Sequence, residues 1–93
     1  MRNLPKELLQ LPNIGKVLAA RLQQAGIDNT KQLVQTGSKR AFLMIMAFDP
    51  EAYVNILYAL EGAIHGMDSK LLSIEKKAEL KLFAHQLDYR VSA

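Results

Sequence analysis

Apolar residues recur at helical spacing in separate segments of the chain, and short polar or glycine-containing stretches divide these segments. In the first half, the pattern predicts helices that begin after Asn3, at Lys16 and at Asp28 or Asn29, and that end before Pro12, at Gly26 and at Gly37. Each boundary carries a residue type that caps or ends helices. This punctuation is typical of an all-helical chain.

The second half begins with a continuously apolar run, AFLMIMAF over residues 41–48. Apolar spacing alone does not separate a buried strand from a buried helix here. The Met, Ala and Leu content favours a helix, which Ser38 would open, and no partner strand is evident elsewhere. A clearer helix is predicted over residues 50–64, with Asp49 as its cap and Glu51 in its first turn.

The last predicted helix begins after Ser73, runs to about Leu87 and carries two apolar stripes on opposite sides. One stripe comprises Ile74, Ala78 and Leu82, and the other comprises Leu80, Phe83, Ala84 and Leu87. A helix on the outside of a monomer needs only one apolar stripe. We therefore expect burial between the core and another body, which is a second copy, another protein or the chain's own N-terminal helix. We expect association through whichever stripe faces outward, and the second stripe is the candidate interface.

Together these elements predict an all-α fold. We expect one domain over residues 1–93, a compact bundle of five or six short helices with a helix-hairpin-helix-like N-terminal half. Leu57 and Leu60 should lie in the core, with Ile14 inserted nearby from the turn that precedes it.

Composition narrows the class of protein. The chain has 93 residues, 49% of them hydrophobic, which makes a disordered chain improbable. Its net charge of +3 is well short of a protein that coats nucleic acid. It has no cysteine and no long uncharged apolar segment near its start, so we expect a cytoplasmic protein without a signal peptide, a membrane span, a disulfide or a thiolate metal site.

The stretch LPNIG, residues 11–15, places a tight turn directly before a helix. Such a turn has two interpretations. It joins two helices, with Ile14 in the core, or it presents the backbone amides of residues 14–17 to a phosphate without reading bases. Asn13 tolerates a left-handed backbone, and Gly15 leaves the approach open.

The candidate nucleic-acid contacts are therefore Asn13, Ile14, Gly15, Lys16, Val17 and Arg21. Lys16 would supply a cation beside the phosphate, and Arg21 would flank it. A basic surface would extend further if the fold brought Lys31, Lys39 and Arg40 close to them. One hairpin offers few phosphate contacts, so any binding should be weak and indifferent to sequence.

Enzyme chemistry has little support in this sequence. Glu61, His65 and Asp68 have a spacing that places them on one helical face, but Gly66 should end the helix before Asp68 is aligned. The serines have the sequence context of caps, and no nucleophile–base pair is suggested. We predict no catalytic residue, no metal site and no cofactor.

Three segments, LPNIGKVLAARLQQAGI, TKQLVQTGS and NILYALEGAIHG, resemble the C-terminal domain of TfoX-type competence regulators. The resemblance covers roughly residues 8–83. It implies a regulatory protein of bacterial type, in a family that is tied to the control of DNA-uptake genes and has no firmly established biochemical activity for this domain. The family usually pairs this domain with an N-terminal α+β domain, so the chain resembles a stand-alone version. Many members carry a tryptophan after the ALEGA helix, where this chain has Met67 and Asp68.

Two functions follow as expectations. The first is a non-enzymatic regulatory module that acts through an unknown protein partner or a homodimer. The second is a weak, sequence-independent contact with DNA through the LPNIG turn.

Overall fold

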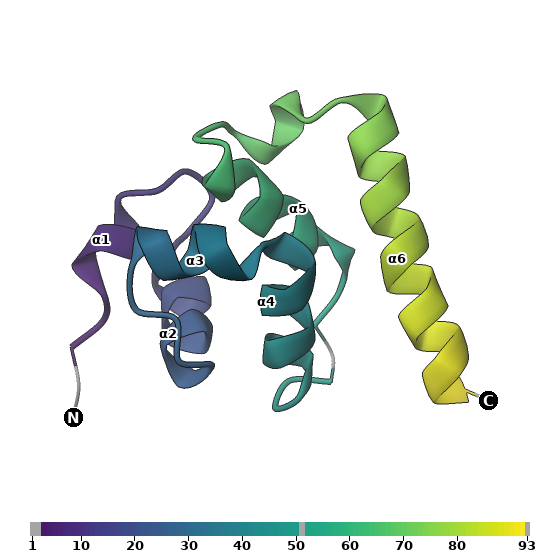
Figure 1. Cartoon of the computed structure of the whole chain (residues 1–93), viewed down its shortest axis with the longest axis horizontal. Helices are drawn as coiled ribbons and strands as arrows, with labels where there is room; N and C mark the ends of the chain where they lie inside the picture. Colours follow the sequence, from purple (N-terminus) through teal and green to yellow (C-terminus); the bar gives the residue numbers. More distant parts are fainter. Residues whose placement is uncertain (1–2, 51, 93) are drawn as a thin grey trace.

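The computed structural model describes residues 3–50 and 52–92, and side chains up to residue 87. These residues form six α-helices, one short 3-10 helix and no strand, which confirms the all-α prediction (Figure 1). The helices are α1 (Lys6–Leu9), α2 (Lys16–Gln24), α3 (Thr30–Thr36), α4 (Ser38–Met46), α5 (Val54–Ile64), η1 (Ser69–Leu71) and α6 (Ile74–Ser92).

Most of the predicted helix ends are confirmed. The Asn29 side chain caps α3 by accepting a hydrogen bond from the Gln32 amide at 2.8 Å. The Ser73 hydroxyl accepts one from the Lys76 amide at 3.0 Å. Gly26, Gly37 and Gly66 have φ values of 88°, 84° and 68°, so the chain reverses at each predicted stop.

The start of α5 differs from the prediction. Asp49 does not cap it, because the helix begins five residues further along the chain, and the Asp49 carboxylate instead forms an ion pair with Arg21 of α2 at 2.9 Å. The helix begins at Val54, after an extended Tyr53, and Glu51 lies outside the described residues. Tyr53, in an extended conformation, is therefore the N-cap of α5 in place of Asp49.

The core draws on all the longer helices. Its largest fully buried side chains are Leu8, Leu22, Ile27, Leu33, Phe42, Ile45, Leu57, Leu60 and Leu80. Ile14 is 5% exposed and belongs to the same cluster, so the predicted placement of Ile14, Leu57 and Leu60 is confirmed.

The helix α5 lies in the middle of the bundle and packs against α3, α4, η1 and α6 (Figure 1). The helix α6 runs along one side of the molecule, at the opposite end from α1. None of the helices in the described part combines the length and the apolar composition of a membrane span.

Candidate functional site

The LPNIG turn has the backbone geometry that the sequence predicts. Asn13 has a φ of 71°, and it is the one non-glycine residue with positive φ in the described chain. Gly15 is the N-cap of α2, and no side chain caps this helix. Gly15 and Lys16 are exposed, and Val17 is 65% exposed. The first turn of α2 is therefore open to solvent.

The Asn13 side chain points away from this open end. Its Nδ2 donates hydrogen bonds to the carbonyl oxygens of Met67 at 2.9 Å and Ala59 at 3.3 Å. Its Oδ1 accepts one from the Ser69 amide at 3.1 Å. Asn13 thus ties the hairpin to α5 and to the segment that follows α5.

Gly62 has no side chain and therefore leaves space for these hydrogen bonds of Asn13. A Cβ atom at Gly62 would lie 2.6 Å from Asn13 Nδ2 and 2.7 Å from the Met67 carbonyl oxygen. The two motifs LPNIG and ALEGA are thus in direct contact in the fold. Sequence reasoning missed this role of Asn13, although a glycine inside an otherwise regular helix is a signal of close backbone approach.

Two of the predicted flanking cations are engaged by other side chains of the protein. Arg21 is paired with Asp49. Lys39 is paired with Glu79 at 2.7 Å and lies 5.5 Å from the centre of the Phe83 ring. The Ile14 amide donates to the Leu11 carbonyl at 3.4 Å, so one of the four candidate amides is used within the turn. Lys16 is the exposed first residue of α2 and lies at this open end.

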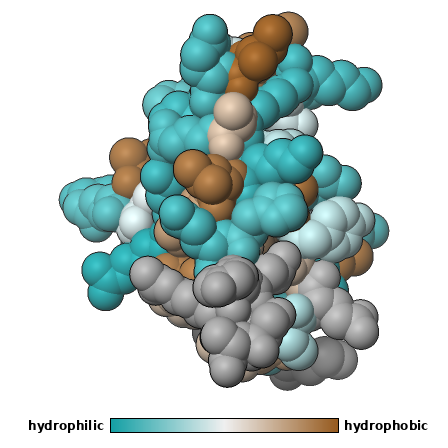
Figure 2. Space-filling model, turned by 90° about the vertical axis from the view of Figure 1, so that its right-hand side faces the viewer, coloured by the Kyte–Doolittle hydropathy of each residue, from teal (hydrophilic) through white to brown (hydrophobic). Residues whose placement is uncertain are grey.

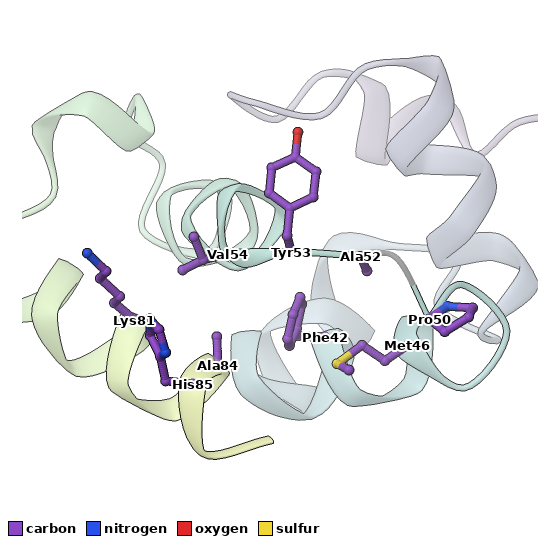
Figure 3. Close-up of a pocket in the computed structure, with 9 residues that line it drawn as sticks. All are labelled: Phe42, Met46, Pro50, Ala52, Tyr53, Val54, Lys81, Ala84 and His85. Atoms are coloured by element: carbon purple, nitrogen blue, oxygen red, sulfur yellow. The ribbon is translucent and has the colours of Figure 1, made fainter. Parts of the chain in front are cut away.

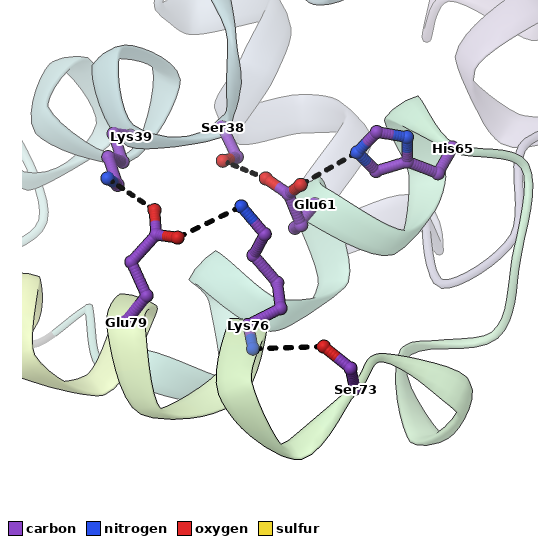
Figure 4. A network of polar contacts seen from close by, with 7 residues as sticks. All are labelled: Ser38, Lys39, Glu61, His65, Ser73, Lys76 and Glu79. Atoms are coloured by element: carbon purple, nitrogen blue, oxygen red, sulfur yellow. Dashed lines mark hydrogen bonds and ion pairs between the residues drawn. The ribbon is translucent and has the colours of Figure 1, made fainter.

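Two sets of polar contacts involve α4 (Figure 4). One joins α4 to α5 through Ser38, Glu61 and His65, and the other joins α4 to α6 through Lys39 and Glu79. Glu61 is 8% exposed, and its carboxylate accepts a hydrogen bond from the Ser38 hydroxyl at 2.5 Å. Its other oxygen lies 2.7 Å from His65 Nε2. Ser38 is the first residue of α4, where the partial positive charge of a helix N-terminus favours an anion.

The surroundings of Glu61 favour its charged form. Burial raises the pKa of this carboxyl group, but the hydrogen bonds from Ser38 and His65 and the charge of Lys76 outweigh burial and hold the pKa below its ordinary value. Asp68 is not part of this network, because its side chain accepts a hydrogen bond from the Lys70 amide at 2.9 Å. The three residues considered as metal ligands are therefore not brought together, and no other group of three His, Asp or Glu side chains is assembled among the described residues.

The two stripes of α6 have opposite environments. Leu80 is fully buried, and Phe83, Ala84 and Leu87 pack against the core as partly buried residues. The stripe named as the candidate interface thus faces inward, since the chain's own core covers it. The other stripe faces outward, with Ile74 84% exposed, Leu82 60% exposed and Ala78 also exposed.

Figure 2 views the molecule from the α6 side and shows brown and pale patches running down a surface that is otherwise mostly teal. Leu71, which precedes α6 in η1, is 71% exposed. Among the described residues, five large apolar side chains are at least 60% exposed. Three of them, Leu71, Ile74 and Leu82, belong to η1 and α6, and the other two are Val17 and Tyr53.

Comparison with known proteins places these features in a family. A family model of the TfoX C-terminal domain matches residues 4–84. Protein Sxy of Escherichia coli (strain K12) is 33% identical over 86 residues, which are 92% of this chain and 41% of Sxy. This chain thus spans about two fifths of the length of that relative.

Two solved structures from Listeria monocytogenes, both of proteins without an assigned function, are similar in sequence and fold. The triclinic form is 47% identical with a TM-score of 0.86, and the match covers 87% of this chain and 92% of that chain. The tetragonal form is 47% identical with a TM-score of 0.82, covering 91% and 99%. With the family model matching most of its length, this chain belongs to the TfoX C-terminal domain family.

Proposed function

We propose that this chain is a non-enzymatic regulatory module that binds a protein partner or a second copy through the outward face of α6. The observation that carries the proposal is the exposed apolar stripe of Ile74, Ala78 and Leu82. Exposed apolar surface on a regular helix is the usual anchor for a partner that lays a complementary helix or groove against it. Membership of a family that is tied to gene regulation supports the same role.

The polar network supports a role outside catalysis. In a hydrolytic triad, histidine lies between the serine and the acid and takes the serine proton. Here the Glu61 carboxylate lies between Ser38 and His65, so the hydroxyl already donates to the acid. Glu61 is also nearly covered, which leaves a substrate little access to it. The arrangement fits a structural link between helices.

The proposal is tested with the double variant Ile74→Glu/Leu82→Glu. Wild-type protein is examined by sedimentation velocity at increasing concentration, and its captured partners are compared by mass spectrometry after nuclease treatment. We expect either a concentration-dependent dimer or a defined captured protein, and the double variant should abolish it. Val34→Glu is the matched control, because Val34 is 50% exposed on α3, away from this stripe. The proposal fails if wild type and double variant behave alike in both measurements.

A second candidate function, weak binding of a nucleic-acid phosphate at the start of α2, is favoured by a separate observation. The helix has no side-chain cap, and a Cβ at Gly15 would meet nothing within 4 Å. The amides of Gly15, Lys16 and Val17 and the Lys16 side chain would hold one phosphate. Arg21 would contribute little, since Asp49 holds it.

Anisotropy of a labelled random DNA duplex at low salt tests this second function. Lys16→Glu should abolish binding, because it places a negative charge beside the phosphate. Lys77→Glu on α6 should leave binding unchanged. Equal loss in both variants would indicate diffuse surface charge, and no binding by the wild type would reduce the LPNIG turn to a helix joint.

A further inference from the structure

A cavity of about 300 Å³ lies between α4, the segment before α5, and α6 (Figure 3). It is independent of the outward face of α6 and of the LPNIG turn. Its lining residues are Phe42, Met46, Pro50, Ala52, Tyr53, Val54, Lys81, Ala84 and His85. Its volume is at the lower end of the range in which proteins hold small organic ligands.

Most residues that line this cavity are apolar or aromatic, although its walls expose polar and apolar surface in about equal measure. Phe42 and Met46 come from α4, Val54 is the first residue of α5, and Ala84 faces them from α6. In Figure 3 the Phe42 ring lies between Ala84 on one side and Met46 on the other. Ala84 is small, which leaves space where a larger residue would close the seam between α6 and α4. An apolar ligand body would gain stabilisation here by leaving water.

Two groups on α6 give the cavity a polar side. Lys81 and His85 are one helical turn apart, and Figure 3 shows them together on the α6 side, across the cavity from Met46 and Pro50. No carboxylate is found among the described residues that line the cavity. Lys81 thus places a positive charge at the described part of this edge, which suits an anion.

Lys81 differs from the other lysines of this helix. Lys76 is paired with Glu79 at 3.1 Å, and the Lys77 ammonium group donates to the Lys70 carbonyl at 3.4 Å. Lys81 has no hydrogen-bond or ion-pair partner among the described residues, nor has His85. Among Lys76, Lys77 and Lys81 of α6, the lysine without a described partner is thus the one at the edge of the cavity.

We propose that this cavity binds a small amphipathic carboxylate, such as a medium-chain acyl or aryl acid. The apolar body lies against Phe42, Met46 and Val54, and the carboxylate lies at Lys81 and His85. Such a ligand would contact α4, α5 and α6 together, and it would stabilise the docking of α6 on the bundle.

The test is an NMR titration of the full chain with octanoate, followed by backbone amide shifts. Saturable shifts are expected for Val54, Lys81 and Ala84, and none for Gly15 at the far hairpin. Two probes of the same chain length, 1-octanol and octylammonium, show how much the charge of the ligand's head group contributes to binding. Octanoate should bind tighter than 1-octanol, and 1-octanol tighter than octylammonium.

The matched variant is Lys81→Met, which keeps the length and apolar character of the stem and removes the charge. It should weaken octanoate binding by about fivefold, the size of a partly exposed ion pair, and leave 1-octanol binding unchanged. Lys77→Met is the control and should change neither. The proposal is overturned if octanoate gives no saturable shifts at the cavity, if octylammonium binds as tightly as octanoate, or if Lys81→Met has no effect.

Discussion

Asn13 meets two requirements at one position. Its backbone adopts φ of 71°, which few residues other than glycine and asparagine tolerate, and its amide group makes three hydrogen bonds to a segment more than 40 residues away. Glycine would meet the first requirement only. The Asn13 side chain is directed toward α5 and the segment that follows α5.

The first prediction separates these two requirements. Asn13→Gly keeps the backbone conformation and removes the hydrogen bonds, and it should lower the free energy of unfolding by about 1–3 kcal/mol because the Met67 carbonyl and Ser69 amide lose their partner. Asn13→Ala should cost more, since it adds backbone strain. Urea denaturation followed by circular dichroism measures both. Equal stability of wild type and Asn13→Gly would show that the hydrogen bonds contribute nothing.

The second prediction concerns Gly62. An alanine inside a helix usually stabilises it by about 1 kcal/mol relative to glycine. Gly62→Ala should instead destabilise the protein, because the new methyl group would lie within 2.7 Å of Asn13 Nδ2 and the Met67 carbonyl oxygen. Gly15→Ala is the control, since a Cβ there meets nothing within 4 Å. A rise in melting temperature for Gly62→Ala would mean that this contact relaxes easily.

At the scale of a single element, α6 presents a matched pair of leucines two residues apart. Leu80 is fully buried and Leu82 is 60% exposed. Leu80→Ala should lower the free energy of unfolding by about 2–4 kcal/mol, whereas Leu82→Ala should stay within about 0.5 kcal/mol of wild type. Thermal unfolding of the two variants in dilute solution measures the difference. Similar losses in both would mean that α6 is docked in another rotation.

Glu61 links two elements, and its effect depends on pH. Because its pKa is lowered in the folded state, its contribution to stability is complete above the unfolded pKa of about 4.3 and is lost as the pH falls through the folded pKa. Glu61→Gln should therefore flatten the fall in stability on acidification below about pH 4.3, and lower stability near neutral pH. Urea midpoints from pH 7 down to pH 3 give the two curves. Glu75→Gln, at an exposed position of α6, is the control, and parallel curves for wild type and Glu61→Gln would contradict the assignment.

Local signals were enough to predict most elements but not the links between them. Gly26, Gly37 and Ser73 act within one turn of their own helix, so the sequence predicts them correctly. Asp49 resembles a cap locally, but its partner Arg21 lies 28 positions earlier, and no local pattern indicates that pairing. The two stripes of α6 were visible in the sequence, whereas their inward and outward assignment depended on which one reaches α5.

In the candidate site, too, the sequence predicts local features but not contacts between distant residues. The backbone of the LPNIG turn was predictable from Asn and Gly, because both act through φ and local space. The engagement of the Asn13 amide with Met67 and Ser69 was not, because it needs the tertiary fold. LPNIG and ALEGA, which both lie in segments that carry the family resemblance, are in contact through Asn13 and Gly62.

At the scale of the whole molecule, one continuous core connects the first helix to the last. It extends from Leu8 in α1 through Leu60 in α5 to Leu80 in α6, all fully buried. The Asn13 hydrogen bonds and the Arg21–Asp49 ion pair bridge the two halves of the chain outside this core. The hairpin half should therefore not be stable without α5.

The last prediction tests whether the whole core unfolds as one cooperative unit. Leu60→Ala should lower the free energy of unfolding by about 2–5 kcal/mol, a large share of the stability of a small domain. Because the core is shared, native-state hydrogen exchange should show a similar loss of protection at Leu22 in α2, at Ile45 in α4 and at Leu80 in α6. If only α5 and α6 lost protection while α2 and α4 kept theirs, the two halves would be separate cooperative units. The contacts of Asn13 would then be a docking surface between those units, and not the middle of a single fold.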